Sequence, residues 1–302
     1  MITDQVTPPP PPGPAPQPEP APVPRWRAAL VPAVPLARVA VLRVVVYLFV
    51  IADIFLFVND VVPHAEGDGA LYQPLLLRRL LDLPAPSPGY AQALQVAIVV
   101  GCLVAATGRL PRLAGAVVAV AFLDWVSIGM SYSKVDHDHL ALVVATWVLP
   151  TVGAAGLRDR TRSEAAGWAL LAIQLAVVAT YFLSAVAKLR FGGWGWANGS
   201  IFAWAMTRRG TPLGRALLDP PWLLRAGQWG VLLMETLSPL LLILRGRWRY
   251  LLVATFVAFH AVTFAMLTIH FLPLVVCLLS FLPLERLTAG RDEQDGWDGK
   301  DG

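Results

Sequence analysis

Residues 166–188 read AGWALLAIQLAVVATYFLSAVAK and contain one charged side chain, that of Lys188. About 20 predominantly apolar residues are enough for a helix to cross a lipid bilayer. Gln174, Tyr181 and Lys188 are spaced by seven, and Ser184 lies four residues before Lys188. With about 3.6 residues per turn, this spacing places all four side chains on one face of a helix. The segment therefore predicts a transmembrane helix whose polar stripe faces protein or water rather than lipid.

The composition of the whole chain points to the same environment. Of the 302 residues, 56% are hydrophobic and 15% are charged, whereas a soluble domain typically carries about 25% charged residues. This composition excludes an ordinary soluble enzyme. The net charge is +4, but the basic residues lie between apolar runs, so we expect a lipid bilayer and no nucleic acid as partner. Both cysteines, Cys102 and Cys277, lie inside apolar runs and provide no disulfide framework.

Apolar runs of similar length recur along the chain and predict about eight spans. They cover residues 38–58, 91–107, 113–130, 139–157, 166–188, 228–244, 250–268 and 271–285. We therefore predict an all-α fold, a polytopic transmembrane helical bundle that occupies residues 25–290.

Arginines mark every second boundary between these spans. They are Arg25, Arg27, Arg109, Arg112, Arg158, Arg160, Arg162, Arg245, Arg247, Arg249, Arg286 and Arg291. Short connections rich in arginine tend to stay in the cytoplasm. Both termini are therefore predicted to be cytoplasmic, in a multi-pass protein of a bacterial-type plasma membrane.

The connection from Lys188 to Gln228 breaks this charge rule. Its arginines are Arg190, Arg208, Arg209, Arg215 and Arg225, at the predicted outer face. Two stretches within it, SIFAWAMTRR at 200–209 and DPPWLLR at 219–225, resemble interfacial helices with tryptophan at the depth of the lipid headgroups. A loop that is long enough to escape the charge rule is the simpler interpretation.

The two ends of the chain differ in composition from the predicted bundle. Residues 1–24 contain 11 of the 26 prolines, which favours a disordered, extended arm. This arm lacks the pattern of a cleaved signal peptide, so we expect the first span to serve as the signal. Residues 291–302 form an acidic tail with five carboxylates, which we predict to be disordered.

Ionisable residues inside predicted spans are functional candidates, because charge in the bilayer is expensive. They are Arg43, Asp53, Asp124, Lys188, Glu235 and His260. Glu235 and His260 lie at about the same depth if residues 245–249, RGRWR, connect antiparallel helices. The two side chains could share a hydrogen bond, and a structural clamp between helices explains them equally well. Asp53 and Asp124 could pair with Arg43 or with a histidine.

The lysine of the polar stripe is an informative choice of residue type. The chain has 21 arginines and three lysines, Lys134, Lys188 and Lys300. Arginine does not usefully lose its proton, whereas a lysine in an apolar site can act as a base. Alternatively, the stripe hydrogen-bonds neighbouring helices while Lys188 extends to the membrane surface.

The segment KVDHDH at 134–139 contains residue types that bind metals, but its spacing is poor for a metal site. His137 and His139 would diverge by about 200° on a helix. The sequence contains no HExxH motif, cysteine pair or glycine-rich phosphate loop. We therefore predict no metal and no nucleotide site.

Four blocks of the chain together resemble the HTTM (horizontally transferred transmembrane) domain, the membrane part of the vitamin K-dependent gamma-carboxylase family. The likeness runs from about Arg38 to Glu285. The blocks are SKVDHDHL (133–140), YFLSAVAKLRFGGWGWANGSIFAW (181–204), METLSPLLLI (234–243) and FHAVTFAMLTIHFLPLVVCLLSF (259–281). The second is the most specific, with a tyrosine, a lysine seven later, and then a tryptophan and glycine.

The resemblance implies an activity and assigns roles. In that family, the lysine of the tyrosine block is the base that deprotonates reduced vitamin K, a menaquinol-like cofactor, and Lys188 is the matching residue. The histidine that supports the reacting glutamate matches His137, and His139 replaces a nearby tyrosine. The family commonly has two adjacent lysines here, whereas this chain has Ala187 before Lys188.

These observations define a candidate site and two hypotheses of function. The predicted catalytic residues are Lys188 and His137, and the predicted pocket residues are Gln174, Tyr181, Ser184, His139, Trp194, Glu235 and His260. The first hypothesis is a carboxylase-like or epoxidase-like membrane enzyme that binds a lipophilic quinol in an outward-facing polar pocket. The alternative is a non-catalytic membrane partner that assists maturation or export of a secreted peptide or protein. A transporter would predict internal repeats, and none is evident.

Overall fold

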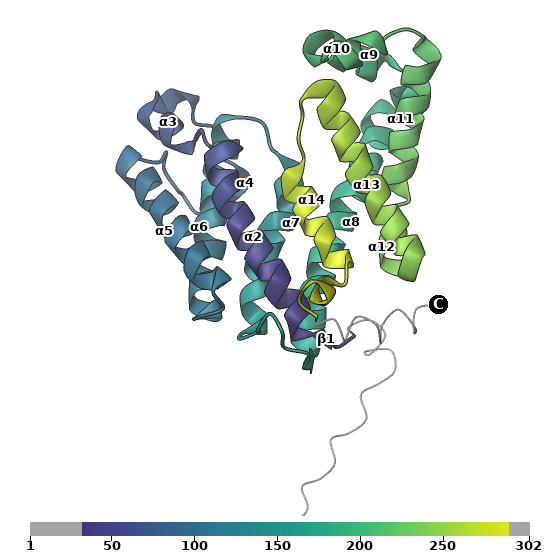
Figure 1. The fold of residues 1–302 in the computed structure, drawn as a ribbon. Coiled ribbons are helices and arrows are strands. Elements are labelled where there is room, and N and C mark those ends of the chain that lie inside the picture. Colours follow the sequence, from purple (N-terminus) through teal and green to yellow (C-terminus); the bar gives the residue numbers. More distant parts are fainter. Residues whose placement is uncertain (1–31, 290–302) are drawn as a thin grey trace, which may run out of the picture.

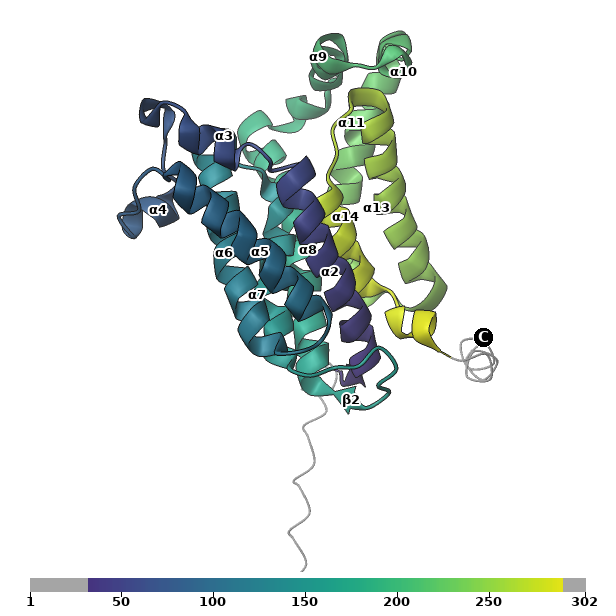
Figure 2. The ribbon, with the colours of Figure 1, turned by 60° about the vertical axis from the view of Figure 1, so that its left-hand side comes forward.

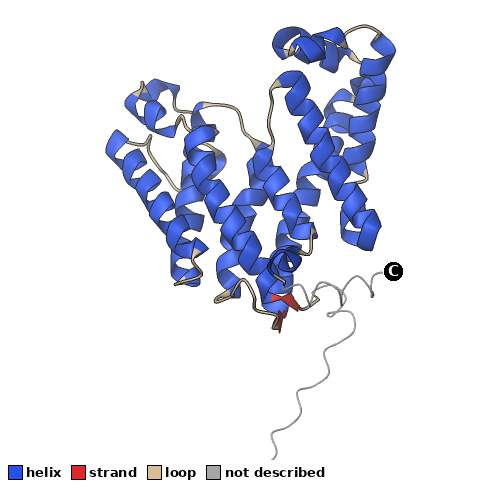
Figure 3. Cartoon of the chain, in the orientation of Figure 1, coloured by secondary structure: helices blue, strands red, loops and turns tan. Residues whose placement is uncertain are grey.

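The computed structural model describes residues 32–289, and nearly all of their regular structure is helical (Figure 3). A short antiparallel pair joins β1 (Val34–Pro35) and β2 (Arg162–Ser163). The prediction of an all-α fold is confirmed. The predicted proline-rich arm and acidic tail lie outside the described residues.

Five helices of the described region are long and apolar enough to cross a membrane. They are α2 (Leu36–Leu56), α5 (Pro88–Ala106), α6 (Pro111–Tyr132), α8 (Glu164–Gly192) and α13 (Gly246–Leu267). Each covers most of a predicted span, and none has a proline after its first turn. Their backbone hydrogen bonds therefore run without interruption.

The other three predicted spans are built from shorter helices. These are α7 (Leu140–Val148) with η3 (Leu149–Val152), α11 (Pro221–Thr236) with α12 (Leu240–Ile243), and α14 (Leu272–Leu278) with η5 (Leu279–Phe281). Pro150 lies in η3, Pro239 separates α11 from α12, and Pro283 follows η5. Proline lacks the backbone donor that continues a helix, which explains why equally apolar runs differ in continuity.

The two ends of the bundle differ in structure (Figures 1 and 2). One end carries β1, β2 and the final turn η6 (Leu284–Thr288), and the opposite end carries short helices. The short elements are α3 (Val61–Glu66), η1 (Gly69–Leu71), α4 (Leu76–Leu80), η2 (His137–His139), η4 (Trp194–Ala197), α9 (Ser200–Arg209) and α10 (Pro212–Ala216). We call α9 and α10 the roof, because they lie across the ends of α11 and α13.

The structure shows what becomes of the two stretches that resemble interfacial helices in the sequence. The stretch 200–209 forms α9 as a separate helix, as predicted. The prediction for 219–225 is wrong, because this stretch contributes the first turn of α11. Pro221 is the first residue of α11, where its fixed backbone angle favours helix initiation and its missing N–H is not needed.

The helices α2 and α6 and the turn η3 approach one another closely at Gly115. A Cβ atom at this position would lie 2.5 Å from Cγ of Pro150 and 2.7 Å from the hydroxyl oxygen of Tyr47. Tyr47 is fully buried, so neither neighbour has free space to move into. Small residues permit such close approaches between membrane helices.

Gly115→Ala is therefore expected to lower the free energy of unfolding by about 1–3 kcal/mol, because it overpacks the core. Gly230→Ala on α11 is the matched control, since a Cβ there meets no atom within 4 Å. Alanine is the better helix former by about 0.5–1 kcal/mol, so the control is expected to be neutral or stabilising. Thermal unfolding of both variants in detergent measures the contrast, and equal melting temperatures would contradict the packing described.

Candidate functional site

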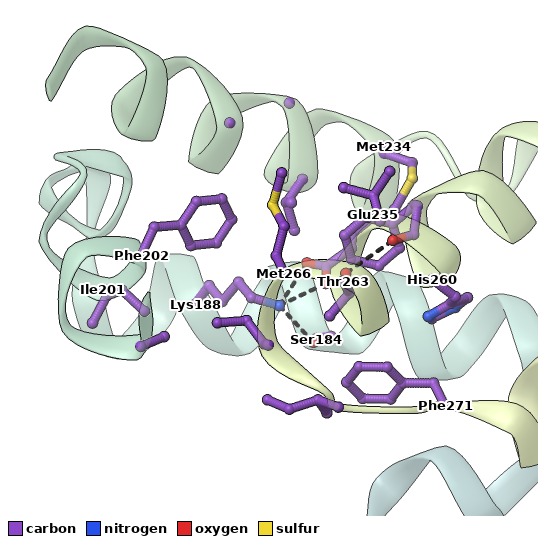
Figure 4. A pocket seen from close by; sticks show the side chains of 18 of the residues that line it. Ser184, Lys188, Ile201, Phe202, Met234, Glu235, His260, Thr263, Met266 and Phe271 are labelled. Carbon is purple, nitrogen blue, oxygen red and sulfur yellow. Dashed lines mark hydrogen bonds and ion pairs between the residues drawn. The ribbon is translucent and has the colours of Figure 1, made fainter. Parts of the chain in front are cut away.

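A cavity of about 600 Å³ lies between α8, α11, α13 and the roof (Figure 4). Its volume is in the range of about 300–1,000 Å³ that is typical of small-molecule sites. Most of its walls are apolar, and they include Phe202 and Met206 of the roof, Met234 of α11, and Met266 of α13. Methionine side chains adapt to ligands of irregular shape. The cavity therefore offers a large and adaptable apolar volume.

The polar stripe of α8 supplies much of the polar surface of the cavity. Tyr181, Ser184 and Lys188 all line it. Gln174 does not line the cavity, because it lies about two helical turns further from the roof than Tyr181. There its amide donates a 2.8 Å hydrogen bond to the carbonyl of Ser280. The predicted stripe is thus shared between the cavity and a contact between helices.

Lys188 and Glu235 form an ion pair in the cavity wall. The ammonium group of Lys188 lies 2.7 Å from each carboxylate oxygen of Glu235 and donates a 2.7 Å hydrogen bond to Ser184. The side chains are 21% and 8% exposed, respectively. The ring of Trp196 lies 5.4 Å from the same ammonium group. Lys188 therefore does not extend to the membrane surface but is held at the cavity.

A second polar pair joins Tyr181 to His260. The tyrosine hydroxyl lies 2.6 Å from Nε2 of His260, and the tautomer decides which of the two donates. Nδ1 of the buried His260 has no hydrogen-bond partner. The predicted contact between Glu235 and His260 is replaced by two separate pairs, one with Lys188 and one with Tyr181. Both residues of this pair line the cavity, so it forms a second polar region of the wall.

His137 and His139 diverge, as their spacing predicts. His137 is exposed at the edge of the cavity and lines it. The buried His139 does not line the cavity, and its Nε2 lies 3.2 Å from both carboxylate oxygens of Asp53, while its Nδ1 lies 3.4 Å from Asp138. Burial opposes the charge of Asp138, but the contact with His139 and the nearby imidazole of His137 outweigh it and lower the pKa of Asp138. The sequence left Arg43 or a histidine open as the partner of Asp53, and the structure pairs it with a histidine.

Trp194 lies outside the cavity. Its exposed ring stacks on that of Trp229, with 6.1 Å between the ring centres. Trp196, two residues later, lines the cavity instead. The sequence also did not indicate that apolar residues of the roof and of α11 line the cavity. In a membrane protein, an apolar side chain can face either a cavity or lipid, and the sequence pattern is the same in both cases.

Asp124 and Arg43 have partners that the sequence did not indicate. Asp124 is bound by Arg78 and by the hydroxyl group of Tyr90, at 2.5 Å, rather than by Arg43 or a histidine. Arg43 donates to the carbonyl groups of Leu149 and Gly153. Neither Asp124 nor Arg43 lines the cavity, so we assign their contacts to the stability of the fold. Across residues 32–289, no cluster of three or more histidine, cysteine or acidic side chains is placed to hold a metal ion.

Comparison with protein families identifies the chain. The family model described as the HTTM domain matches residues 33–285. The chain belongs to the HTTM family. Neither curated proteins nor solved structures give a match. The HTTM match and the long apolar helices together make this a multi-pass membrane protein.

Proposed function

We propose that this HTTM protein binds a lipophilic molecule of the quinol class, such as reduced vitamin K, in the cavity beneath the roof. The observation that carries the proposal is the Lys188–Glu235 pair, which lies in the wall of an otherwise apolar volume. Removing two charges from water is expensive unless they are well paired. A ligand hydroxyl group that is to be bound and deprotonated gives such a pair a use at this position.

The pair also supports a proton-transfer role, in which Lys188 is the general base and Glu235 is its proton acceptor. An ammonium ion cannot take up a proton, so Lys188 must first pass one to Glu235, 2.7 Å away. The neutral amine then takes the proton of a quinol hydroxyl group, and the restored ammonium stabilises the quinolate. One proton thus moves from the quinol to Glu235. The resemblance of Lys188 to the family base supports this assignment.

The polar contacts of the cavity suit a molecule with more than one oxygen. The Lys188–Glu235 pair provides one contact, and the Tyr181–His260 pair, which also lines the cavity, provides a second. His137, at the edge, is placed to assist a reacting group that enters from outside the cavity. These groups support the catalytic roles of Lys188 and His137 in a carboxylase-like or epoxidase-like reaction.

We further propose eight membrane crossings with both termini in the cytoplasm of a bacterial-type cell. The guanidinium group of Arg38, in the first turn of α2, is paired with Glu285 in η6. Arg160 donates a 2.9 Å hydrogen bond to the backbone carbonyl of the same Glu285. The first and last described helices therefore meet at one end of the bundle, which requires an even number of crossings. The arginines gathered there favour the cytoplasmic side.

Filling the cavity tests the binding proposal. Gly230 lines the cavity, and a Cβ added there meets no atom within 4 Å. Gly230→Leu is expected to weaken binding of a menaquinol analogue to the purified protein by about tenfold or more, because the leucine occupies about the volume of several ligand atoms. Its melting temperature is expected to stay at the parental value, and Gly230→Ala is the control for the binding assay.

Two outcomes would overturn the binding proposal. One is unchanged binding in Gly230→Leu, which would place the ligand elsewhere. The other is that the parent itself binds no quinol analogue. The second outcome would favour the alternative function, a membrane partner for a secreted peptide or protein.

A further inference from the structure

The roof and its flanks carry an excess of positive charge that the proposed function does not use. Residues 190–227 contain five arginines and one acidic residue, Asp219. Arg208 and Arg209 in α9 and Arg215 in α10 are all exposed. For these three, which we call the roof arginines, no ion pair with an acidic residue exists within residues 32–289. The roof therefore offers charge without a partner in the described protein.

Tryptophans accompany these arginines. Residues 194–229 contain five of the 11 tryptophans of the chain. Trp204 of α9 is 62% exposed and Trp222, near the start of α11, is 66% exposed. The guanidinium group of Arg208 lies 5.3 Å from the centre of the Trp204 ring. Tryptophan and arginine with this exposure on a short helix are typical of the headgroup layer of a bilayer.

The placement of the roof fits that layer. The roof lies over the ends of α11 and α13, at the end of the bundle opposite β1 and β2 (Figures 1 and 2). Phe202 and Met206 line the cavity from the roof, so one side of α9 is already covered. Thr211 fixes the roof to the end of α13, because its backbone N–H donates to the carbonyl of Met266 at 2.9 Å and its hydroxyl donates to the carbonyl of Ala265 at 2.7 Å. The roof arginines thus lie at the level where the membrane helices end.

We propose that the roof arginines bind the headgroups of acidic phospholipids in the leaflet on the cavity side. Guanidinium groups form paired hydrogen bonds with phosphate oxygens. With the topology proposed above, the charge rule for membrane proteins disfavours arginines at this end of the bundle, and a compensating partner would explain their presence. Acidic headgroups provide that partner without any change in the fold.

Lipid-specific fluorescence quenching tests this proposal in the full-length protein. A fluorophore is attached at Thr207→Cys, which is exposed between Trp204 and Arg208, since both native cysteines are buried. The protein is placed in bilayers in which the quencher is carried either by phosphatidylglycerol or by phosphatidylcholine, at equal mole fraction. We expect about twofold or greater quenching by the acidic lipid over the neutral lipid, because basic residues at the surface attract acidic headgroups.

The roof arginines are then replaced together. In R208Q/R209Q/R215Q the ratio of quenching is expected to fall to about one, and in R208K/R209K/R215K it is expected to remain above one, since charge is retained. A fluorophore at Val257→Cys, exposed in the middle of α13, is the control site and should give a ratio near one in every variant. The melting temperature shows that each variant is folded.

A ratio of one at position 207 in the parent would overturn the proposal and assign the roof arginines to another partner, such as an acidic protein segment. A ratio above one that persists in the glutamine variant would overturn it as well. The test involves no quinol, so its failure is independent of the proposed function.

Discussion

Lys188→Met is expected to lower the free energy of unfolding by about 3 kcal/mol, because it leaves the carboxylate of Glu235 in the cavity wall without its counter-charge. The carboxylate accepts hydrogen bonds from the lysine through both of its oxygens, and its side chain is only 8% exposed. Thermal unfolding in detergent measures the loss. The same variant is expected to lose quinol deprotonation, because the amine that receives the proton is absent.

The double variant Lys188→Met/Glu235→Met separates stability from function. Replacing both partners of a buried ion pair by apolar residues is often neutral or stabilising, so the melting temperature should return close to the parental value. Quinol oxidation or epoxidation should remain absent. A single Lys188→Met variant as active as the parent would remove Lys188 from catalysis, and one as stable as the parent would show that Glu235 is not charged in the fold.

His139→Leu is expected to cost about 3 kcal/mol of unfolding free energy, since it leaves the carboxylate of the fully buried Asp53 without its side-chain partner. The matched control is Lys134→Gln. Lys134 also forms an ion pair at this turn, with 2.7 Å between its ammonium group and Asp136, but its side chain is 75% exposed. Exposed pairs of this kind contribute little to stability. Thermal unfolding of both variants measures the contrast.

The His139→Leu variant also has an expected effect on the cavity. The contact of His139 with Asp53 orients η2, the single turn that presents His137 at the cavity edge. Loosening this turn should weaken quinol binding more than Lys134→Gln does. Equal melting temperatures for the two variants would show that the buried contact does not stabilise the fold, and equal binding would show that it does not orient His137.

The long helices could be predicted from hydropathy because an uninterrupted apolar run has few alternatives in a bilayer. The run at 38–58 forms α2 (Leu36–Leu56) and the run at 250–268 forms α13 (Gly246–Leu267), so each helix lies close to its predicted limits. The run at 139–157 is equally apolar but contains Pro150, and it becomes α7 followed by η3. Window averages of hydropathy do not distinguish proline from other weakly polar residues, so the breaks were not predicted.

The candidate site was predictable only along single helices. The spacing within α8 placed Tyr181, Ser184 and Lys188 on one face, and the structure brings all three to the cavity. Which residue of another helix meets them depends on how each helix is rotated, and sequence spacing carries no such information. The expected partner of Glu235 was therefore His260, whereas the structure pairs it with Lys188.

Gln174 shows what the seven-residue spacing within α8 cannot predict. It shares a face of α8 with Lys188 but lies at a different depth, where a carbonyl of η5 takes its hydrogen bond. A stripe predicts the direction in which side chains point, but not the point along the helix where a cavity ends. Trp194 differs from Trp196 for the same reason, since only the local path of η4 decides which ring enters the cavity.

The contact between Arg38 and Glu285 brings the beginning and the end of the described chain together. Helix α2 and the turn η6 are neighbours, and a linker that joins them would stay at one end of the bundle. Circular permutation is tolerated where the ends of a domain are close and exposed loops are available. The loop at 154–158, at the same end of the bundle, is such a place for new termini, so the order of the helices along the chain can be changed while their order in space is kept.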